Sequence, residues 1–423
     1  MNAPAEISAS TLASSGDSAG LADSAARALY ARDGAPHQHA REGVHGLQGS
    51  KIREVANAAM GREGLLPFWF GEPDQVTPDF IRAAAIESLN NGETFYTHSF
   101  GIAPLREAIA AYVRGLHGGA TSVANIAVTN SGMNALTLIF QALISPGDRV
   151  VAVTPLWPNL TQGPKILSAD VHMVSLDFGR DGWTLNLQKL LDALTPGTRF
   201  LLINSPNNPT GWTMSRAEQE AVLAHCRKHG IWIVADDAYE RLVFADNQNC
   251  APSFLDIATP DDRVVSANTF SKSWMMTGWR LGWIVAPPPL LADLAKLIEF
   301  NICCAQSFVQ RAGFAAVTKG AAVTQAFVAR LKHGRDVLVP RLAQIDGVHV
   351  VAPPGAMYAF FKIDGVTDSL ALCKHLAANH GLGLAPGVAF GPEGYVRWCF
   401  AASDERLLEG ATRLERGLKD RPR

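Results

Sequence analysis

The stretch NTFSKSWMMTGWRLGW, residues 268–283, joins two apolar runs and carries one lysine and one arginine among hydroxyl and aromatic side chains. The run before it is VVSAN at 264–268, and the run after it is LGWIVA at 281–286. Both runs are rich in β-branched or aromatic residues and lack a clean alternation, which is typical of strands buried on both faces. Lys272 therefore follows the end of a predicted buried strand, where a lysine must either reach solvent or have a function.

Four earlier apolar runs have the same character, and helical segments lie between several of them. These runs are IAVT at 126–129, VVAVT at 150–154, FLLIN at 200–204 and IWIVA at 231–235. Ser215 and Glu218 form a predicted capping box at the start of one helix. Pro78 occupies the first position of another predicted helix. The alternation of strands and helices predicts an α/β fold with a mostly parallel sheet flanked by helices.

The pattern changes after about residue 320, where a long helix is followed by GAMYAFFKI, a helix near 368–380 and YVRWCFA. This succession indicates a smaller α+β domain. The first 45 residues are rich in Ala, Ser, Gly and His and show weak periodicity, which predicts a mobile tail. We therefore expect the tail at 1–45, a large domain at 76–324, and a small domain formed by 46–75 and 325–423.

The composition excludes several classes of protein. The formal net charge is −2 and no basic tract is present, so neither nucleic acid nor a membrane is an expected partner. The six cysteines have no CxxC spacing, which favours reduced thiols in a cytoplasmic protein. No secretory signal and no apolar run of about 20 residues is apparent. The chain also lacks GxGxxG, Walker A, HExxH and GxSxG motifs, and we expect no metal site.

Polar residues gather instead at the carboxyl ends of the predicted strands, where open α/β sheets bind their ligands. Thr129 to Met133 form a small-residue turn before a helix, whose free N–H groups suit an anion, although an ordinary capped turn has the same composition. The NSPNNPTG segment at 204–211 places two asparagines in a turn that either projects amides into a cleft or is simply a loop. Asp236, Asp237 and Tyr239 follow another strand. There Asp236 either pairs with a cation, a metal or a protonated ring nitrogen, or caps the next helix.

Two cations complete the set of candidate residues. Lys272 lies among hydroxyl groups with Arg280 eight positions later, which suits a phosphate site and a lysine whose pKa is lowered by a neighbouring cation. Arg397 in YVRWCFA is flanked by Val and Trp. It either fixes a planar carboxylate through two parallel hydrogen bonds or forms a structural salt bridge.

Taken together, the order and spacing of these motifs resemble those of the fold-type I pyridoxal-phosphate enzymes, specifically the class I/II aminotransferases. The resemblance extends from about Ser50 to the C-terminus. It rests on GEPD, YTHSFGIAPLR, NSGMNAL, NSPNNPTG, DDAY, FSKSWMMTGWRLGW, GAMYAFF and YVRWCFAAS. It implies the large and small domains of that fold and pyridoxal 5'-phosphate as the cofactor.

The resemblance also implies a role for each candidate residue. Lys272 is similar to the lysine that forms the Schiff base with the cofactor, and Asp236 to the aspartate that pairs with the pyridinium nitrogen. The residues that would contact the cofactor ring are Trp157, Asn208 and Tyr239. The residues that would hold its phosphate are Ser131, Gly132, Met133, Thr269, Ser271, Arg280 and, from the neighbouring subunit of a homodimer, Tyr96. The residues that would bind the substrate α-carboxylate are Gly71, Asn208 and Arg397.

Two positions depart from the commonest pattern of the family, because Trp157 replaces a tyrosine and Thr269 replaces a serine. Both changes keep the stacking surface or the hydroxyl group. The resemblance implies an aminotransferase that moves an amino group between an L-amino acid and a 2-oxo acid with ping-pong kinetics. A pyridoxal-phosphate carbon–sulfur lyase on the same scaffold is an alternative. A ligand-sensing regulatory protein is a third reading, which the short and weakly basic N-terminal segment disfavours.

Overall fold

The computed structural model describes residues 40–421 of the chain. The chain divides into two units at Gly46, and the described part of the first unit contains only the short helix α2 (Glu42–His45). The second unit begins at Leu47 and holds every other helix and strand discussed below. The tail predicted for 1–45 lies almost wholly outside the described residues. The boundaries predicted for the large and small domains stay predictions.

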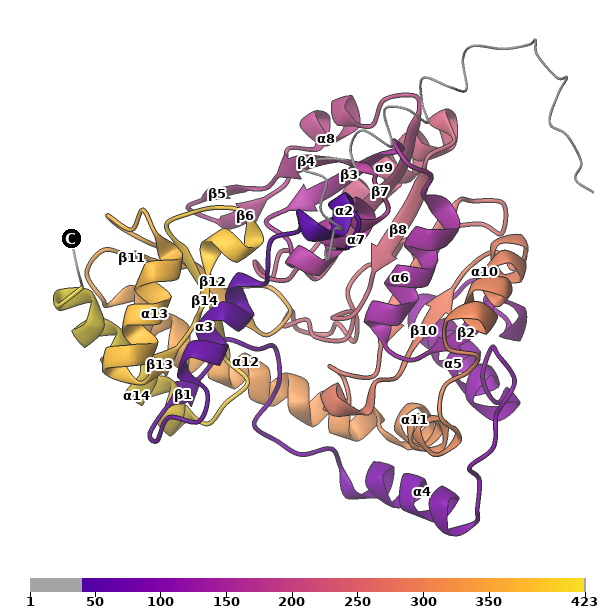
Figure 1. The fold of residues 1–423 in the computed structure, drawn as a ribbon, viewed down its shortest axis with the longest axis horizontal. Helices are drawn as coiled ribbons and strands as arrows, with labels where there is room; N and C mark the ends of the chain where they lie inside the picture. Colours follow the sequence, from indigo (N-terminus) through magenta and orange to yellow (C-terminus); the bar gives the residue numbers. More distant parts are fainter. Residues whose placement is uncertain (1–39, 422–423) are drawn as a thin grey trace, which may run out of the picture. The chain divides into compact units, whose positions relative to one another are not determined.

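A seven-stranded sheet forms the centre of the second unit (Figure 1). Its strand order is β2-β10-β9-β8-β7-β3-β4, and all neighbours are parallel except β10, which is antiparallel to both β2 and β9. The strands are β2 (Ile126–Thr129), β3 (Arg149–Thr154), β4 (Asp170–Ser175), β7 (Thr198–Asn204), β8 (Trp232–Asp236), β9 (Val264–Thr269) and β10 (Gly282–Val285). The mostly parallel α/β fold and all six predicted strands are confirmed.

The sequence analysis missed β4, and its exposure explains why. β4 is the edge strand next to β3, and only Val174 among its six residues is buried. A strand of this kind lacks the continuous apolar run by which the central strands are recognised.

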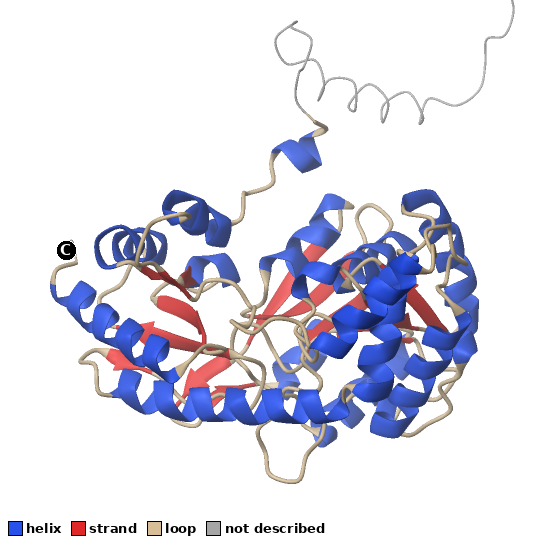
Figure 2. Ribbon diagram, turned by 90° about the horizontal axis from the view of Figure 1, so that it is seen from below, coloured by secondary structure: helices blue, strands red, loops and turns tan. Residues whose placement is uncertain are grey.

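Helices cover both faces of the large sheet (Figures 1 and 2). Side chains that alternate along β3 show this directly, because Val150 and Ala152 pack with α6, α7 and α10, whereas Val151 and Val153 pack with α8 and α9. Three further helices, α4, α5 and α11, pack beside β2 and β10. The helices are α4 (Asp79–Asn90), α5 (Ala103–His117), α6 (Gly132–Leu143), α7 (Pro158–Ile166), α8 (Leu187–Ala193), α9 (Arg216–His229), α10 (Pro288–Asn301) and α11 (Ser307–Lys319).

The predicted helix starts are present in the structure. Ser215 caps α9, and its hydroxyl accepts from the Glu218 N–H while the Glu218 carboxylate accepts from the Ser215 N–H. Pro78 is the N-cap of α4, so the helix begins at Asp79, one residue later than predicted. Such one-residue differences are usual at helix ends.

A smaller antiparallel sheet lies beside the large one, with strand order β11-β12-β15-β14. Its strands are β11 (Val348–His349), β12 (Tyr358–Ile363), β14 (Ala385–Pro386) and β15 (Tyr395–Cys399), and its helices are α3 (Lys51–Ala59), α12 (Ala321–Ala343), α13 (Ser369–His380) and α14 (Asp404–Lys419). Two short strand pairs complete the fold, β1 (Leu66–Pro67) with β13 (Leu382–Gly383) and β5 (Asp177–Gly179) with β6 (Gly182–Thr184). Figure 1 shows α12 running between the two groups of elements. Among residues 40–421, none of the helices combines the length and apolar character needed to cross a bilayer.

A buried ionic cluster lies next to the segment that follows β8. His117, the last residue of α5, is 1% exposed, and its two ring nitrogens lie 3.2 Å from Glu240 Oε2 and 2.6 Å from Asp256 Oδ1. Arg216 also pairs with Asp256. Burial opposes protonation of His117, but the hydrogen bonds to Asp256 and Glu240 outweigh burial and raise its pKa to about 11. His117 is therefore a charged link between α5 and the chain after β8.

We predict that His117→Gln lowers the free energy of unfolding by about 3 kcal/mol at neutral pH, because the change leaves buried carboxylates without their cation. The folded-state pKa lies above the ordinary value of 6.5, so the stabilisation is complete below that pH and declines as the pH rises toward 11. Urea unfolding from pH 6 to pH 10 should therefore show a difference between wild type and variant that shrinks with pH.

The matched control is His333→Gln. His333 pairs with Asp404 at the surface, where the two side chains are 63% and 51% exposed. This change should alter stability by no more than about 0.5 kcal/mol. Equal and pH-independent effects of the two variants would contradict the role assigned to His117.

Candidate active site

A cavity of about 690 Å³ lies at the carboxyl ends of β7, β8 and β9. It is lined by twelve of the fourteen residues that the sequence analysis selected: Gly71, Gly132, Met133, Trp157, Asn208, Asp236, Tyr239, Thr269, Ser271, Lys272, Arg280 and Arg397. These residues come from positions as far apart as 71 and 397. The folded chain therefore brings together residues that the sequence could only group by analogy.

The two remaining residues, Ser131 and Tyr96, do not line the cavity. Ser131 is buried at the N-cap of α6, where its hydroxyl accepts a hydrogen bond from the Asn134 N–H at 3.0 Å. Tyr96 is 91% exposed on the surface of the chain. Within a single chain, Ser131 caps the helix and Tyr96 makes no contribution to this cavity.

Asp236 is the last residue of β8, and its side chain is buried. Its Oδ1 accepts from the Ala238 N–H at 3.3 Å. Burial raises the pKa of Asp236 to about 7, against the lowering effects of that hydrogen bond and of the Lys272 charge. At this pKa, part of the carboxyl group is protonated near neutral pH. A cation bound in the cavity would lower the pKa again and favour the ionised carboxylate.

Lys272 lies three residues beyond β9, and its Nζ donates to the Gly71 carbonyl at 2.5 Å. The ammonium also lies 5.6 Å from the centre of the Tyr239 ring. Burial lowers the pKa of Lys272 to about 8, and the Arg397 and Arg280 charges act in the same direction. A much larger fraction of its amine is therefore neutral and nucleophilic near neutral pH than for an ordinary lysine.

The start of α6 and the Thr269–Ser271 turn form one wall of the cavity. The Thr269 hydroxyl donates to the Ser271 hydroxyl at 2.9 Å, and Arg280 has left-handed backbone with φ of 53°. Gly132 is the first residue of α6, and a Cβ at Gly282 would approach the Gly132 nitrogen to 2.5 Å. Hydroxyl groups, a guanidinium and a helix N-terminus thus meet on one wall, a combination that suits a phosphate group.

Arg397 on β15 also lines the cavity. Its guanidinium donates to Asn208 Oδ1 at 2.7 Å and to the Trp69 carbonyl, and it lies 4.3 Å from the centre of the Tyr358 ring. Its Nε is buried and has no hydrogen-bond partner among the described residues. No carboxylate forms a salt bridge with Arg397 in the described part of the chain, so the structural salt bridge considered above is not what holds it.

Sequence reasoning assigned no role to two residues that position this site. Asn204, at the end of β7, donates to the Asp236 carbonyl at 3.0 Å and accepts from the Asn208 N–H at 2.7 Å. The Tyr358 hydroxyl is hydrogen-bonded to the Tyr239 hydroxyl at 2.7 Å. Both residues belong to quoted motifs, NSPNNPTG and GAMYAFF, but only the fold reveals their contacts.

The cavity fits the cofactor expected from the sequence. Asp236 supplies a buried carboxyl group for a protonated ring nitrogen, Lys272 supplies an amine, and the α6 wall supplies phosphate donors. A Cβ at Gly71 would lie 1.8 Å from the Tyr358 hydroxyl, so glycine leaves room for that ring at the cavity. Pyridoxal phosphate requires this set of groups, and Arg397 lines the same cavity with one buried nitrogen that has no partner among the described residues.

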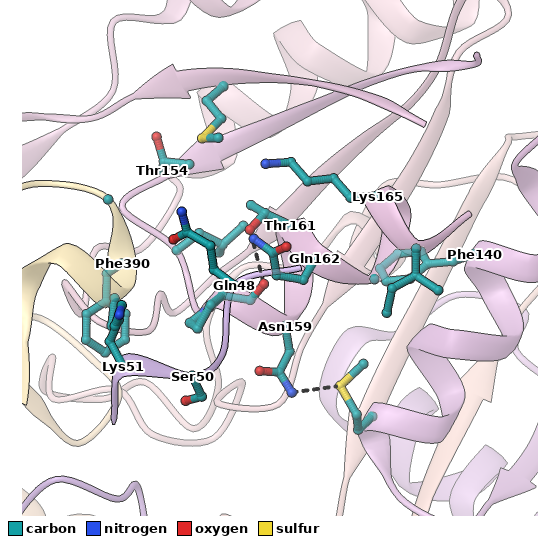
Figure 3. Close-up of a pocket in the computed structure, with 18 of the residues that line it drawn as sticks. Gln48, Ser50, Lys51, Phe140, Thr154, Asn159, Thr161, Gln162, Lys165 and Phe390 are labelled. Atoms are coloured by element: carbon teal, nitrogen blue, oxygen red, sulfur yellow. Dashed lines mark hydrogen bonds between the residues drawn. The ribbon is translucent and has the colours of Figure 1, made fainter. Parts of the chain in front are cut away.

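Figure 3 shows a second cavity, of about 460 Å³, which shares part of its lining with the first. Ser50, Met133 and Asn159 line both cavities, and the Asn159 amide lies 3.6 Å from the Met133 sulfur. Among the described residues, its lining includes the side chains of Lys51 and Lys165 but no carboxylate. The main cavity thus shares lining residues with a second space whose described charged side chains are both positive.

Comparison with known proteins agrees with this geometry. Residues 65–414 match the family described as Aminotransferase class I and II. The aspartate aminotransferase of Pyrococcus horikoshii is 32% identical over 378 residues, 88% of this chain and 95% of that protein. The aspartate aminotransferase of Thermotoga maritima is 34% identical over 360 residues, 85% of this chain and 93% of that protein. The arginine–pyruvate transaminase of Pseudomonas aeruginosa is 31% identical over 365 residues, 86% and 92% of the two chains.

Solved structures of aspartate aminotransferases have the same fold. The structure from Thermotoga maritima superposes with a TM-score of 0.83 at 31% identity, covering 90% of this chain and 100% of that one. The structure from Rhizobium meliloti gives a TM-score of 0.83 at 29% identity, covering 91% and 99%.

We predict that Lys272 is the lysine that carries the cofactor. Borohydride reduction in the presence of pyridoxal phosphate, followed by peptide mapping, should place the label on Lys272. The rate of labelling should rise with pH through about 8, where this amine loses its proton. Lys272→Ala should abolish both the label and amino transfer, because no other lysine among residues 40–421 lines the main cavity.

Lys296→Ala is the matched control, because Lys296 is an exposed lysine paired with Asp293 on α10. This variant should be labelled at Lys272 like the wild type. A label on any lysine other than Lys272 would overturn the assignment.

Proposed function

The chain belongs to the aminotransferase class I and II family and is an aminotransferase, and we propose that it transfers the amino group of an L-amino acid to a 2-oxo acid with pyridoxal 5'-phosphate. The relatives reported above are all aminotransferases or transaminases, which does not favour a carbon–sulfur lyase. The observation that carries the proposal is the burial of Asp236 and Lys272 in one cavity, with pKa values of about 7 and about 8.

Each group of residues has a proposed task. The residues that would hold the cofactor are Ser131, Gly132, Met133, Thr269, Ser271 and Arg280 at the phosphate and Trp157, Asn208, Asp236 and Tyr239 at the ring. When bound, pyridoxal phosphate supplies an electron sink for the substrate α-carbon. Asp236 would hold a proton on the ring nitrogen, because a carboxylate beside it favours the charged form. Lys272 would remove the proton from the substrate Cα as a general base, for which a pKa of about 8 is suited.

Arg397 would bind the substrate α-carboxylate, together with Asn208 and the Gly71 backbone. The unpartnered Nε supports this task, as do the rings of Tyr358 and Phe390, whose centres lie 4.3 and 4.7 Å from the guanidinium carbon. Contacts with two rings restrict the orientation of the guanidinium before a planar carboxylate binds. The side chain of the substrate would extend toward the 460 Å³ cavity, whose charges are positive. Acidic and neutral amino acids are therefore favoured over basic ones.

We also propose a cytoplasmic homodimer. All six cysteines are unpaired, as expected for a reducing compartment. Phe95, Tyr96 and Phe300 are 84%, 91% and 86% exposed. The Thr97 N–H donates to Cys304 Sγ at 3.4 Å, so the segments that carry these aromatic side chains lie side by side. A group of large exposed apolar side chains on two adjoining segments is typical of a protein interface.

The function is tested by adding single L-amino acids to the holoenzyme and following the cofactor spectrum as each half-reaction proceeds. We expect conversion by aspartate, glutamate or neutral amino acids to exceed conversion by arginine and lysine. Arg397→Lys should lower kcat/KM about 10- to 150-fold for every amino acid that reacts, because lysine cannot form two parallel hydrogen bonds.

Two outcomes would contradict this assignment. Ammonia and pyruvate formed from one amino acid without a 2-oxo acid would support the lyase. A loss confined to one class of side chain in Arg397→Lys would place Arg397 in the side-chain pocket.

The dimer is tested by complementation. Lys272→Ala subunits mixed with Tyr96→Ala subunits should recover about half the activity of one wild-type dimer in each mixed dimer, since one of its two sites then has both native residues. Mixing either variant with itself is the control. Lack of recovery despite subunit exchange proven by two different affinity tags would mean that Tyr96 serves no neighbouring site.

A further inference from the structure

Two imidazoles and one carboxylate converge at a position outside the active-site cavity. His375 and His380 belong to α13, and Asp420 is the first residue beyond α14. Asp420 Oδ1 lies 3.2 Å from His375 Nε2 and 3.0 Å from His380 Nε2. One ligand-type atom from each of the three side chains lies within 4.8 Å of the other two. None of these residues lines the 690 Å³ cavity or its neighbour.

The packing of α13 on α14 holds both rings in place. The two histidine side chains are only 14% and 13% exposed, and their ring centres lie 5.4 Å apart. A Cβ at Gly417 would lie 2.9 Å from the His380 ring, so the glycine in α14 allows this ring to lie against the helix. The convergence of the ring edges on Asp420 is therefore fixed by packing, while the carboxylate, at 59% exposed, leaves one side open to solvent.

The donor set is the one that zinc prefers. Zinc binds imidazole nitrogen and carboxylate oxygen at about 2.0–2.2 Å, usually with four ligands in a tetrahedron. Ligand atoms of such a site lie about 3.4 Å apart, close to the 3.0 and 3.2 Å found here. Three protein ligands would leave the fourth position, on the exposed side, for water.

The surroundings fit this use of the histidines. Asn379 Nδ2 lies 2.9 Å from His375 Nδ1. With the amide turned over, its oxygen would accept from Nδ1–H and leave Nε2 free to bind a metal, a second hydrogen bond that commonly accompanies a histidine ligand. Arg413 donates hydrogen bonds to the carbonyl oxygens of His380 and Gly381 at the end of α13, and so leaves both imidazoles free of this contact. The Asp420 carboxylate forms its side-chain hydrogen bonds with the two imidazoles.

We propose that His375, His380 and Asp420 bind a zinc ion that ties the end of α14 to α13. The sequence analysis expected no metal site, because the three ligands match no spacing motif and meet only when the two helices pack. The ion is a structural link and takes no part in amino transfer. Without the ion, both imidazoles are hydrogen-bonded to the Asp420 carboxylate.

The test is a zinc titration of the untagged holoenzyme by calorimetry, together with metal analysis after dialysis. We expect one zinc ion per chain that is lost in the double variant His375→Gln/His380→Gln. Asp420→Asn should weaken zinc binding at least about 10-fold, since removal of a direct ligand should cost no less than loss of a supporting hydrogen bond. Zinc should raise the Tm of the wild type, and this shift should be lost in both variants.

The double variant His225→Gln/His229→Gln is the matched control. Those two histidines lie one helical turn apart on α9 with ring centres at 4.5 Å, but in the described part of the chain no third possible ligand joins them. The control should keep the zinc ion and the Tm shift. Cobalt should give visible d–d bands of a tetrahedral site in the wild type and in the control but not in His375→Gln/His380→Gln. Zinc binding of wild-type stoichiometry and affinity in that variant would overturn the proposal, as would the absence of zinc binding by the wild type.

Discussion

The burial of Asp236 and Lys272 in one cavity is the constraint on which the rest of the site depends. Each side chain has lost most of its hydration, so the pKa of the carboxyl group rises and the pKa of the amine falls. Within the chain they have few partners, a backbone N–H for Asp236 and the Gly71 carbonyl for Lys272. In the proposed function, the cofactor would supply a cationic ring nitrogen beside Asp236 and a carbonyl carbon for the Lys272 amine.

Parallel strands place these two groups together. Asp236 lies beside Asn204 of β7 on one side and Ala267 of β9 on the other, so the three strands end at the same edge of the sheet. Asn204 then fixes the adjoining loop by bonding both the Asp236 carbonyl and the Asn208 N–H. On the far side of the chain that follows β8, His117 holds Glu240 through a buried ionic contact. The segment that carries Asp236 and Tyr239 is therefore fixed from both sides.

The smaller sheet supplies the other half of the chemistry. Arg397 on β15 and Tyr358 on β12 reach the cavity, and they contact Asn208 and Tyr239 from the large sheet. The buried guanidinium is kept in position by aromatic rings and by neutral acceptors, without a carboxylate of its own. In the proposed function, this charge would bind the substrate carboxylate. The proposed cofactor contacts would then come mainly from segments at the large sheet, and the proposed carboxylate contact from the smaller sheet.

The sequence by itself determined the fold class and the six central strands, because apolar runs report burial on both faces. Polar residues after such runs indicated the edge of the sheet where the cavity lies, and the family resemblance named most of the residues that line it. Even there, the edge strand β4 was missed because it is largely exposed.

Only the tertiary structure decided the contacts made between distant segments. Four groups of contacts are of this kind: the Tyr239–Tyr358 hydrogen bond, the partners of Arg397, the His117 cluster, and the convergence of His375 and His380 on Asp420. The residues that they join are separated by between 40 and 328 positions. Such contacts depend on how helices and sheets pack in three dimensions, and no local pattern in the chain records that packing.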